Sequence, residues 1–154
     1  MPKTVAEAQH LEGENALPLT LTAFFSTPLA AGKSRPGALL AHEAFRGYAL
    51  PAGVNAQRII YHSQDAEGRD VTSSAVVLTP PGQPPKGGWP VIVWAHGTSG
   101  AARQCAPSLM KDLYYGNEGL FAFLAGGFAV IAVDYHGLGT AGPHQYVDKV
   151  AHAA

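Results

Sequence analysis

The chain has 154 residues, of which 47% are hydrophobic and 14% are charged, and its formal net charge is −1. Such a chain can bury the core of one domain and is too apolar to be disordered. The absence of any basic run argues against nucleic acid as a partner, and no stretch reaches the roughly 18 unbroken apolar residues of a membrane helix. The one cysteine, Cys105, excludes an intramolecular disulfide, and the spacing of the seven histidines predicts no metal site.

The first 23 residues are predicted to be a flexible N-terminal segment ahead of a domain that spans residues 24–154. Residues 16–32 faintly resemble the apolar core of a signal peptide, but Glu12 and Glu14 stand where positive charge is expected. We therefore predict no export signal in this segment and leave the compartment open.

Three strands are predicted in the first half of the domain. Residues 56–63 and 71–79 are rich in branched and aromatic side chains, and the polar residues 64–70 between them indicate a turn. This pattern predicts an antiparallel hairpin. A weaker strand is expected within residues 38–48, and the proline-rich residues 80–90 form a loop that cannot join a sheet.

Two further strands and a connecting helix are predicted in the second half. Residues 91–95 and 128–133 are short, unbroken apolar runs, which are typical of strands buried on both faces. Residues 109–124 have the apolar spacing of a helix, and Gly126 and Gly127 are expected to end it. Because a helix joins them, the two strands are predicted to be parallel.

A turn at residues 134–143 follows the second apolar strand, and a helix is predicted to begin at Pro143 and to run through Val150. A hairpin followed by parallel strand–helix units predicts an α/β fold, in which functional groups gather at the carboxyl ends of the strands. The chain ends inside the first turns of this helix, so we expect the N-terminal half of a larger domain.

The stretch HGTSG after the first apolar strand supports two interpretations. Gly97, Thr98 and Ser99 match the first positions of the G-x-S-x-G turn that presents a nucleophilic serine, but Ala101 replaces the last glycine. No histidine and carboxylate can be assigned as the base and its orienting group. Alternatively, Gly97 allows close approach of the backbone, and the N–H of Thr98 stabilises the oxyanion of acyl transfer. We prefer this second interpretation and keep Ser99 as a weaker candidate nucleophile.

The turn after the second apolar strand carries further candidates. Gly137, Gly139 and Gly142 have the G-x-G-x-x-G spacing directly after a strand, which leaves a nucleotide-binding domain as a weaker alternative. Asp134 and Tyr135 are predicted to form the floor of the site, and we interpret the Asp134 carboxylate as a turn cap rather than a catalytic group.

Four stretches together resemble the secretory lipase family of lipase-A-like α/β-hydrolases. The resemblance begins near Phe24 and continues to the end of the chain, and it depends on the combination of HGT, the downstream CAPS and the D-Y-x-G-x-G turn. The stretches are FFSTPLAAGKSRPGALL, LPAGVNAQRIIYHSQDAEGRDVTSSAVVLTP, VIVWAHGTSGAARQCAPS and FLAGGFAVIAVDYHGLGTAG.

This resemblance implies an α/β-hydrolase-type sheet and a serine hydrolase of carboxylic esters, a lipase or esterase, with small-molecule or lipid substrates and no cofactor. It matches Thr98 to the family's first oxyanion-hole residue. The family's serine, aspartate and histidine follow later in the chain, so the resemblance implies a triad beyond Ala154 and an inactive chain on its own. It also implies secretion, and it matches Cys105 to a cysteine that can be disulfide-bonded in relatives.

A non-catalytic fragment or interaction module is the alternative from a different class. In the α/β-hydrolase order, the strand at residues 91–95 pairs with the strand that carries the nucleophile, so we expect its edge to be open here. An open apolar edge invites association. We therefore expect the chain to be poorly soluble, to self-associate, or to pair with a partner that supplies the remaining strands.

Overall fold

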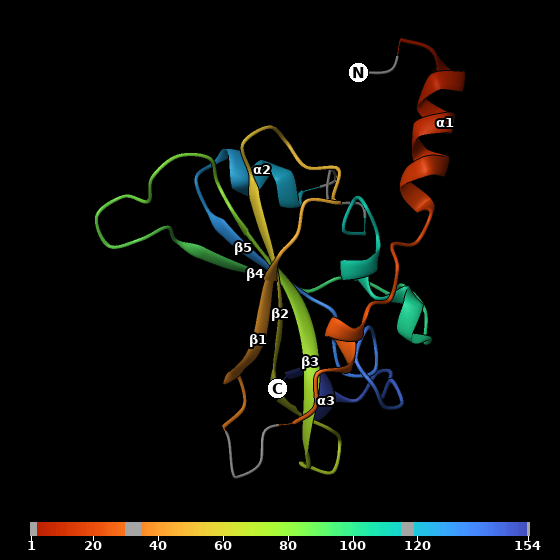
Figure 1. The fold of residues 1–154 in the computed structure, drawn as a ribbon, viewed down its shortest axis with the longest axis vertical. Helices are drawn as coiled ribbons and strands as arrows, with labels where there is room; N and C mark the ends of the chain where they lie inside the picture. The colour runs from red at the N-terminus through yellow and green to blue at the C-terminus, as the bar shows by residue number, and fades with distance from the viewer. Residues whose placement is uncertain (1–2, 30–34, 115–118, 154) are drawn as a thin grey trace.

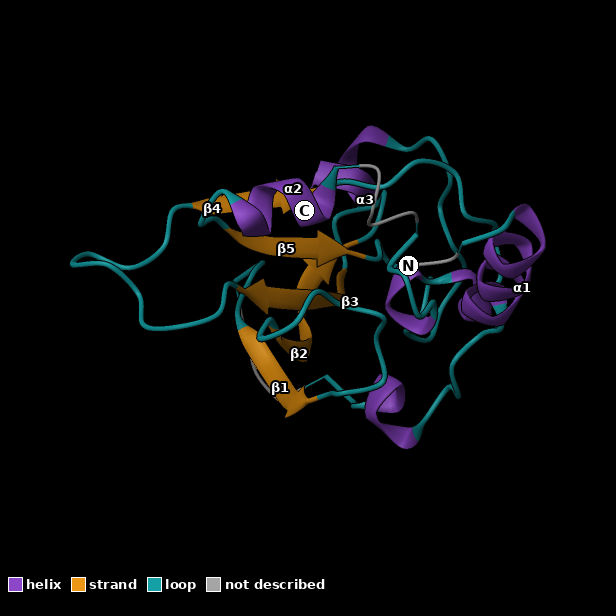
Figure 2. Ribbon diagram, turned by 90° about the horizontal axis from the view of Figure 1, so that it is seen from above, coloured by secondary structure: helices purple, strands orange, loops and turns teal. Residues whose placement is uncertain are grey.

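The computed structural model describes residues 3–29, 35–114 and 119–153. Within these residues, five strands form one sheet in the order β1-β2-β3-β5-β4 (Figure 1). Neighbouring strands are antiparallel except β4 and β5, which are parallel. The loop between β3 and β4 projects from one end of the sheet, and the chain turns after β4 and β5 at the other (Figure 2). The strands are β1 (Leu39–Ala44), β2 (Asn55–Gln64), β3 (Asp70–Thr79), β4 (Val91–Trp94) and β5 (Ala129–Val133).

The predicted hairpin is confirmed as β2 and β3. The pairing runs without a shift from Asn55 opposite Thr79 to Gln64 opposite Asp70. The weaker strand expected before it is β1, which pairs with β2. The richness of β2 and β3 in branched and aromatic residues predicted them, because such side chains pack well on the pleated surface of a sheet.

The parallel pairing of β4 and β5 also agrees with the prediction, but β4 is not buried on both faces. Val91 is 58% exposed and Val93 is 63% exposed. They point to the face opposite Trp94, whose ring lies 6.3 Å from that of Phe123 in α2 (Leu120–Ala125). Because β4 is the last strand of the sheet and α2 covers one of its faces, the other face remains exposed.

The helix predicted over residues 109–124 is much shorter than expected. Leu113 and Tyr114 have φ of 55° and 58°, in the left-handed region that an α-helix cannot include. Residues 115–118 of the prediction lie outside the described residues, and only α2 is helical beyond them. Gly126 caps that helix, as predicted, and Gly127 follows with φ of 83°.

The helix predicted to begin at Pro143 begins six residues later, as α3 (Lys149–Ala153). Val147 has φ of 58°, so a right-handed helix that began at Pro143 could not continue through this residue. The side chain of Asp148 accepts hydrogen bonds from the N–H groups of Val150 and Ala151 at 2.8 and 3.0 Å. This capping carboxylate sets the start of α3.

The N-terminal helix α1 (Val5–Ala16) extends away from the sheet (Figure 1). The N–H of Leu19 is the first backbone group after α1 that bonds to the rest of the fold, at 2.7 Å from the carbonyl oxygen of Leu109. Phe25 follows in the short 3₁₀ turn η1 (Ala23–Ser26) and is buried. The domain boundary at residue 24 stays a prediction. None of the helices in the described ranges has the length and apolar character that a bilayer crossing requires.

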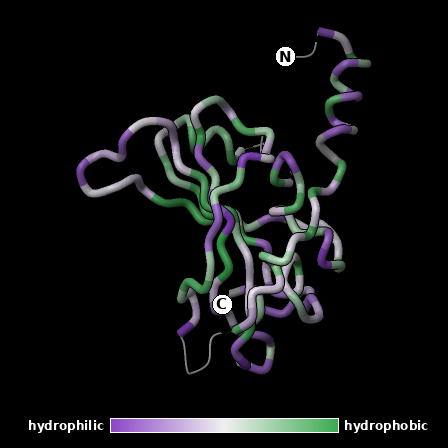
Figure 3. The backbone as a smooth tube through the Cα atoms, in the orientation of Figure 1, coloured by the Kyte–Doolittle hydropathy of each residue, from purple (hydrophilic) through white to green (hydrophobic). Residues whose placement is uncertain are grey.

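A buried arginine lies between two apolar clusters on one face of the sheet. Arg58 is 1% exposed, and its guanidinium lies 3.3 Å from the ring centroid of Phe45. It donates to the Tyr48 hydroxyl at 2.8 Å and to the Ser108 carbonyl oxygen at 3.2 Å. β5 is largely hydrophobic, whereas the tip of the β3–β4 loop is hydrophilic (Figure 3). One cluster is Tyr48, Ala56, Val76, Leu78, Leu113, Leu120, Leu124, Val130 and Ala132, and the other is Phe25, Ile60, Ala106, Leu109 and Leu138.

Candidate functional site

The two turns that the sequence singled out lie together, as expected for the carboxyl ends of neighbouring parallel strands. They border a hollow of about 170 Å³, which we call the β4–β5 hollow. Residues of the segment before α3 and of α3 itself complete its wall. The lining residues are His96, Gly97, Thr98, Ser99, Gly100, Tyr135, Leu138, His144, Tyr146 and His152.

Two tyrosines hold Thr98 from either side. The Tyr114 hydroxyl donates to the Thr98 carbonyl oxygen at 2.6 Å, and the Tyr146 hydroxyl shares a short hydrogen bond with Thr98 Oγ1. The backbone N–H of Thr98 donates to no acceptor in the described part of the chain. The peptide is thus fixed in place while its N–H remains available to a ligand.

His96 braces the same turn. Its Nδ1 lies 2.5 Å from the Gly97 carbonyl oxygen, and its Nε2 lies 3.4 Å from the Asp134 carbonyl oxygen. Burial lowers the pKa of His96, and the nearby His144 and His152 lower it further, against the two backbone contacts that raise it. A neutral imidazole has one N–H, so it can donate to only one of these two carbonyl oxygens, and its contact with the other is one of packing. The ring lies between the β4 turn and the β5 turn and contacts both.

Ser99 has no arrangement that would activate it. Its Oγ is buried and lacks a hydrogen-bond partner among residues 3–29, 35–114 and 119–153. A serine nucleophile requires a base within hydrogen-bond reach. The structure therefore brings no described histidine or carboxylate to this hydroxyl.

In this turn, close packing leaves no room for a side chain at Gly100. It has φ of 129°, and a Cβ there would lie 2.5 Å from Cys105 Sγ. Among the described residues, a Cβ at Gly97 would meet only the Tyr114 side chain, with its hydroxyl at an ordinary 3.6 Å. The role of Gly97 in admitting a substrate stays a prediction, whereas Gly100 was overlooked because its φ cannot be read from the sequence.

Asp134 lies behind the hollow, with a fully buried side chain. Its carboxylate accepts from Ser74 Oγ at 2.5 Å and from the Ser108 N–H at 2.8 Å, at the start of the 3₁₀ turn η3 (Pro107–Leu109). Burial raises its pKa to about 6, although hydrogen bonds from Ser108 and Ser74 and the charge of Arg58 oppose this rise. The carboxylate thus caps a turn from another part of the chain, while the neighbouring Tyr135 lines the hollow.

The three glycines with nucleotide-binding spacing have a packing explanation. Gly137, Gly139 and Gly142 have φ between 72° and 115°. A Cβ at Gly137 would overlap the His144 backbone, and one at Gly139 or Gly142 would lie 2.8 Å from Ser74 Oγ or 2.7 Å from the His136 ring. The turn they form leads to a segment without regular secondary structure, and the next helix along the chain in the described residues is α3, which begins at Lys149. The geometry adds no support to a nucleotide site.

Several residues of the hollow were not found by sequence reasoning. His152 stacks on Tyr135 with ring centroids 4.5 Å apart, and it also stacks on His144 at 5.7 Å. The sequence shows these side chains as isolated aromatic residues because their contacts depend on how the segment before α3 folds back. In the described part of the chain, no group of three or more His, Cys, Asp or Glu side chains is placed to hold a metal ion.

The fold is similar to that of known ester hydrolases. Lipase A of Candida antarctica superposes with a TM-score of 0.58 and 20% identity over 79% of this chain and 31% of the lipase. The ligand-bound rice cell wall degrading esterase LipA of Xanthomonas oryzae superposes with a TM-score of 0.50 and 20% identity over 68% of this chain and 31% of the esterase. No family model and no curated protein matches the chain. The chain spans about a third of the length of these two structures, and its mixed open sheet is compatible with an incomplete α/β-hydrolase fold.

Proposed function

We propose that this chain carries the oxyanion-hole part of a carboxylic ester hydrolase of the secretory lipase type. The observation that carries the proposal is the Thr98 peptide, which is held by Tyr114 and Tyr146 with its N–H directed to no acceptor among the described residues. The fold likeness to a lipase and an esterase supports the reaction class.

The chemistry requires few side chains from this part of the molecule. Attack on an ester builds negative charge on the carbonyl oxygen, and a fixed backbone N–H stabilises that charge without reorganising. In α/β-hydrolases one donor comes from the turn after an earlier strand, and the other follows the nucleophile. Thr98 would supply the first donor, His96 would hold its turn, and the residues that line the β4–β5 hollow would contact the ester. We assign no nucleophile to the described residues.

The proposal is tested with butylphosphonate, whose tetrahedral oxyanion resembles the intermediate of ester hydrolysis. Calorimetry on the full chain is expected to show weak binding that Thr98→Pro reduces about tenfold or more, since a hydrogen bond to a charged group contributes about 1.5–3 kcal/mol. Thr98→Ser keeps the N–H and should bind like the unmodified chain. Among backbone amides, the resonance of Thr98 should move most on titration. Equal binding by Thr98→Pro, or an unmoved Thr98 resonance, would refute the assignment.

A second candidate function, an interaction module, is favoured by the exposed side of β4. Val91 and Val93 are more than half exposed, and β4 has a neighbouring strand on one side only, within the described sheet. Another strand could pair with the free edge and cover these side chains. This function and the oxyanion role are compatible, because the edge of β4 and the turn that follows it are different surfaces.

A further inference from the structure

A second and larger hollow lies on the other side of the turn after β5. It encloses about 480 Å³, within the range of small-molecule sites, and we call it the β3 hollow. Its wall combines the end of η1 with the segment that follows it, the β2–β3 turn with the start of β3, and the turn after β5. The lining residues are Phe25, Ser26, Thr27, Pro28, Leu29, Asp65, Arg69, Asp70, Val71, Thr72, His136, Ala141, Gly142, Pro143 and Gln145.

We propose that the β3 hollow binds a small, neutral, apolar alcohol or phenol, which donates its hydroxyl proton in a hydrogen bond to Nε2 of His136. The proposal does not depend on the ester hydrolase assignment, because none of its residues lines the β4–β5 hollow.

The hydrogen bonds of His136 determine which of its ring nitrogens carries the proton. The side chain is buried, with the residue 5% exposed, and Nδ1 lies 3.0 Å from the Thr72 carbonyl oxygen. A carbonyl oxygen can only accept, so Nδ1 must carry the proton. In the neutral ring, Nε2 therefore presents a lone pair. Thr140 Oγ1 donates to the same carbonyl at 2.9 Å, which fixes this arrangement from a second side.

We infer from three observations that the lone pair of Nε2 faces the β3 hollow. No described residue forms a hydrogen bond with Nε2. The nitrogen is also not sealed inside the protein, unlike the described buried polar atoms that have no partner, so it borders open space. His136 lines the β3 hollow, which supplies that space. A Cβ at Gly142 would lie 2.7 Å from Nε2, so glycine at this position keeps the nitrogen uncovered.

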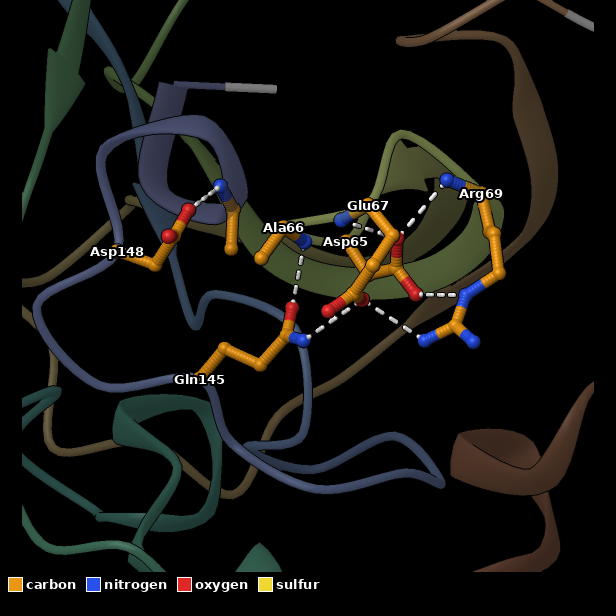
Figure 4. Close-up of polar contacts among 7 residues, drawn as sticks. Asp65, Ala66, Glu67, Arg69, Gln145 and Asp148 are labelled. Atoms are coloured by element: carbon orange, nitrogen blue, oxygen red, sulfur yellow. Dashed lines mark hydrogen bonds and ion pairs between the residues drawn. The ribbon is translucent and has the colours of Figure 1, made fainter.

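Charged groups around the hollow are already paired, which favours a neutral ligand. Asp65 accepts from Arg69 Nε at 2.6 Å, and Asp70 lies 2.9 Å from His62 Nδ1. Gln145 is also occupied: its Oε1 accepts from the Ala66 N–H at 2.7 Å, and its Nε2 donates to Glu67 at 3.2 Å (Figure 4). A carboxylate ligand would face Asp65 and Asp70, and the cation among the described lining residues, Arg69, is already paired with Asp65 and Glu67.

The remaining lining favours an apolar body attached to the hydroxyl. Much of the surface is carbon, from side chains on the three segments that form the wall. Burial of apolar ligand surface against these groups supplies the affinity, and the single acceptor supplies the selectivity. The apolar lining residues are Phe25, Pro28, Leu29, Val71, Ala141 and Pro143.

The test compares two probes that differ in one hydrogen-bond donor, 4-methylphenol and 4-methylanisole. Both are titrated at mildly alkaline pH into the full chain labelled with ¹⁵N in histidine. We expect 4-methylphenol to bind about tenfold more tightly, and the His136 Nε2 resonance, unprotonated at the start, to shift on binding. Equal affinities for the two probes, no binding of either, or a protonated Nε2 in the free protein would overturn the proposal.

Two variants separate the hydrogen bond from the cavity. His136→Asn retains an N–H near the Thr72 carbonyl and lacks Nε2, so both probes should bind it equally. Ala141→Leu leaves His136 in place and fills the hollow, so both probes should lose binding. Lys86→Ala, in the β3–β4 loop, is the matched control and should bind like the unmodified chain. If His136→Asn fails to fold, the Ala141→Leu variant and the comparison of the two probes still test the proposal. Undiminished binding of the probes to Ala141→Leu would refute the site.

Discussion

Replacing Asp134 with asparagine is expected to change how the stability of the fold depends on pH. Burial raises the pKa of this carboxyl from 3.8 to about 6, which corresponds to roughly 3 kcal/mol of free energy. A raised pKa means that the folded state favours the protonated carboxyl. Its contribution is therefore fully present below pH 3.8 and is lost as the pH rises through about 6. The amide that replaces the carboxyl in the Asp134→Asn variant has no such proton to lose.

The assay is urea unfolding of both proteins at several values from about pH 4 to about pH 8. The free energy of unfolding of the unmodified chain, minus that of Asp134→Asn, should fall by roughly 2.4 kcal/mol across this range, because at pH 4 the unfolded carboxyl is already about half ionised. Glu12→Gln, on the exposed helix α1, controls for a change of one charge and should show no such trend. Parallel curves, or a difference that grows with pH, would show that Arg58 and the hydrogen bonds outweigh burial and would refute this reasoning.

Three further predictions follow from the turns and the edge strand. Gly100→Ala should lower the free energy of unfolding by about 1–3 kcal/mol, because its Cβ would overlap Cys105. Gly13→Ala, in open space on α1, should instead be neutral or slightly stabilising, and equal effects of the two substitutions would contradict the packing argument. Val93→Lys should reduce the self-association of the chain measured by sedimentation velocity, because it places a charge on the exposed edge strand. An unmodified chain that is a monomer at high concentration would contradict this prediction. A proton NMR titration of His96 should have its midpoint below pH 6.5 because burial disfavours the charged ring, and a midpoint above that value would contradict the burial.

The sheet could be predicted from the sequence because local patterns determine it. Two runs of branched and aromatic side chains with a polar turn between them specify the β2–β3 hairpin, and two apolar runs specify β4 and β5. The position of β4 at the edge could not be predicted in the same way. An apolar run does not reveal whether a neighbouring strand or helix covers it, and here Val91 and Val93 are exposed.

The prediction of a helix over residues 109–124 was wrong because of contacts with distant segments, which the preferences of single residues do not reflect. Hydrogen bonds from other segments engage its first part: the Leu109 carbonyl accepts from Leu19, and the Lys111 carbonyl accepts from Ala49. These backbone contacts between distant segments replace helical ones, and Leu113 then has a positive φ. Apolar spacing alone gives no sign of this competition.

The sequence located the two turns of the candidate site but not the side chains that hold Thr98 in place. The carboxyl-end rule placed the HGTSG turn beside the turn after β5, and both line the same hollow. Tyr114 and Tyr146 fix Thr98 by hydrogen bonds. Their positions depend on turns with positive φ at Tyr114 and Val147, which no sequence motif encodes. Arg58 was also missed, because a polar residue in a strand is expected to face solvent.

Covalent labelling with a fluorophosphonate, which reacts with activated serine nucleophiles, tests most directly whether the HGTSG turn supplies a backbone donor and not the nucleophile. The full chain is incubated with the probe, and any adduct is mapped by mass spectrometry, with Ser99→Ala as the matched control. We expect no adduct on Ser99, because no described base contacts its hydroxyl. An adduct on Ser99, absent from Ser99→Ala and accompanied by hydrolysis of p-nitrophenyl butyrate, would contradict it.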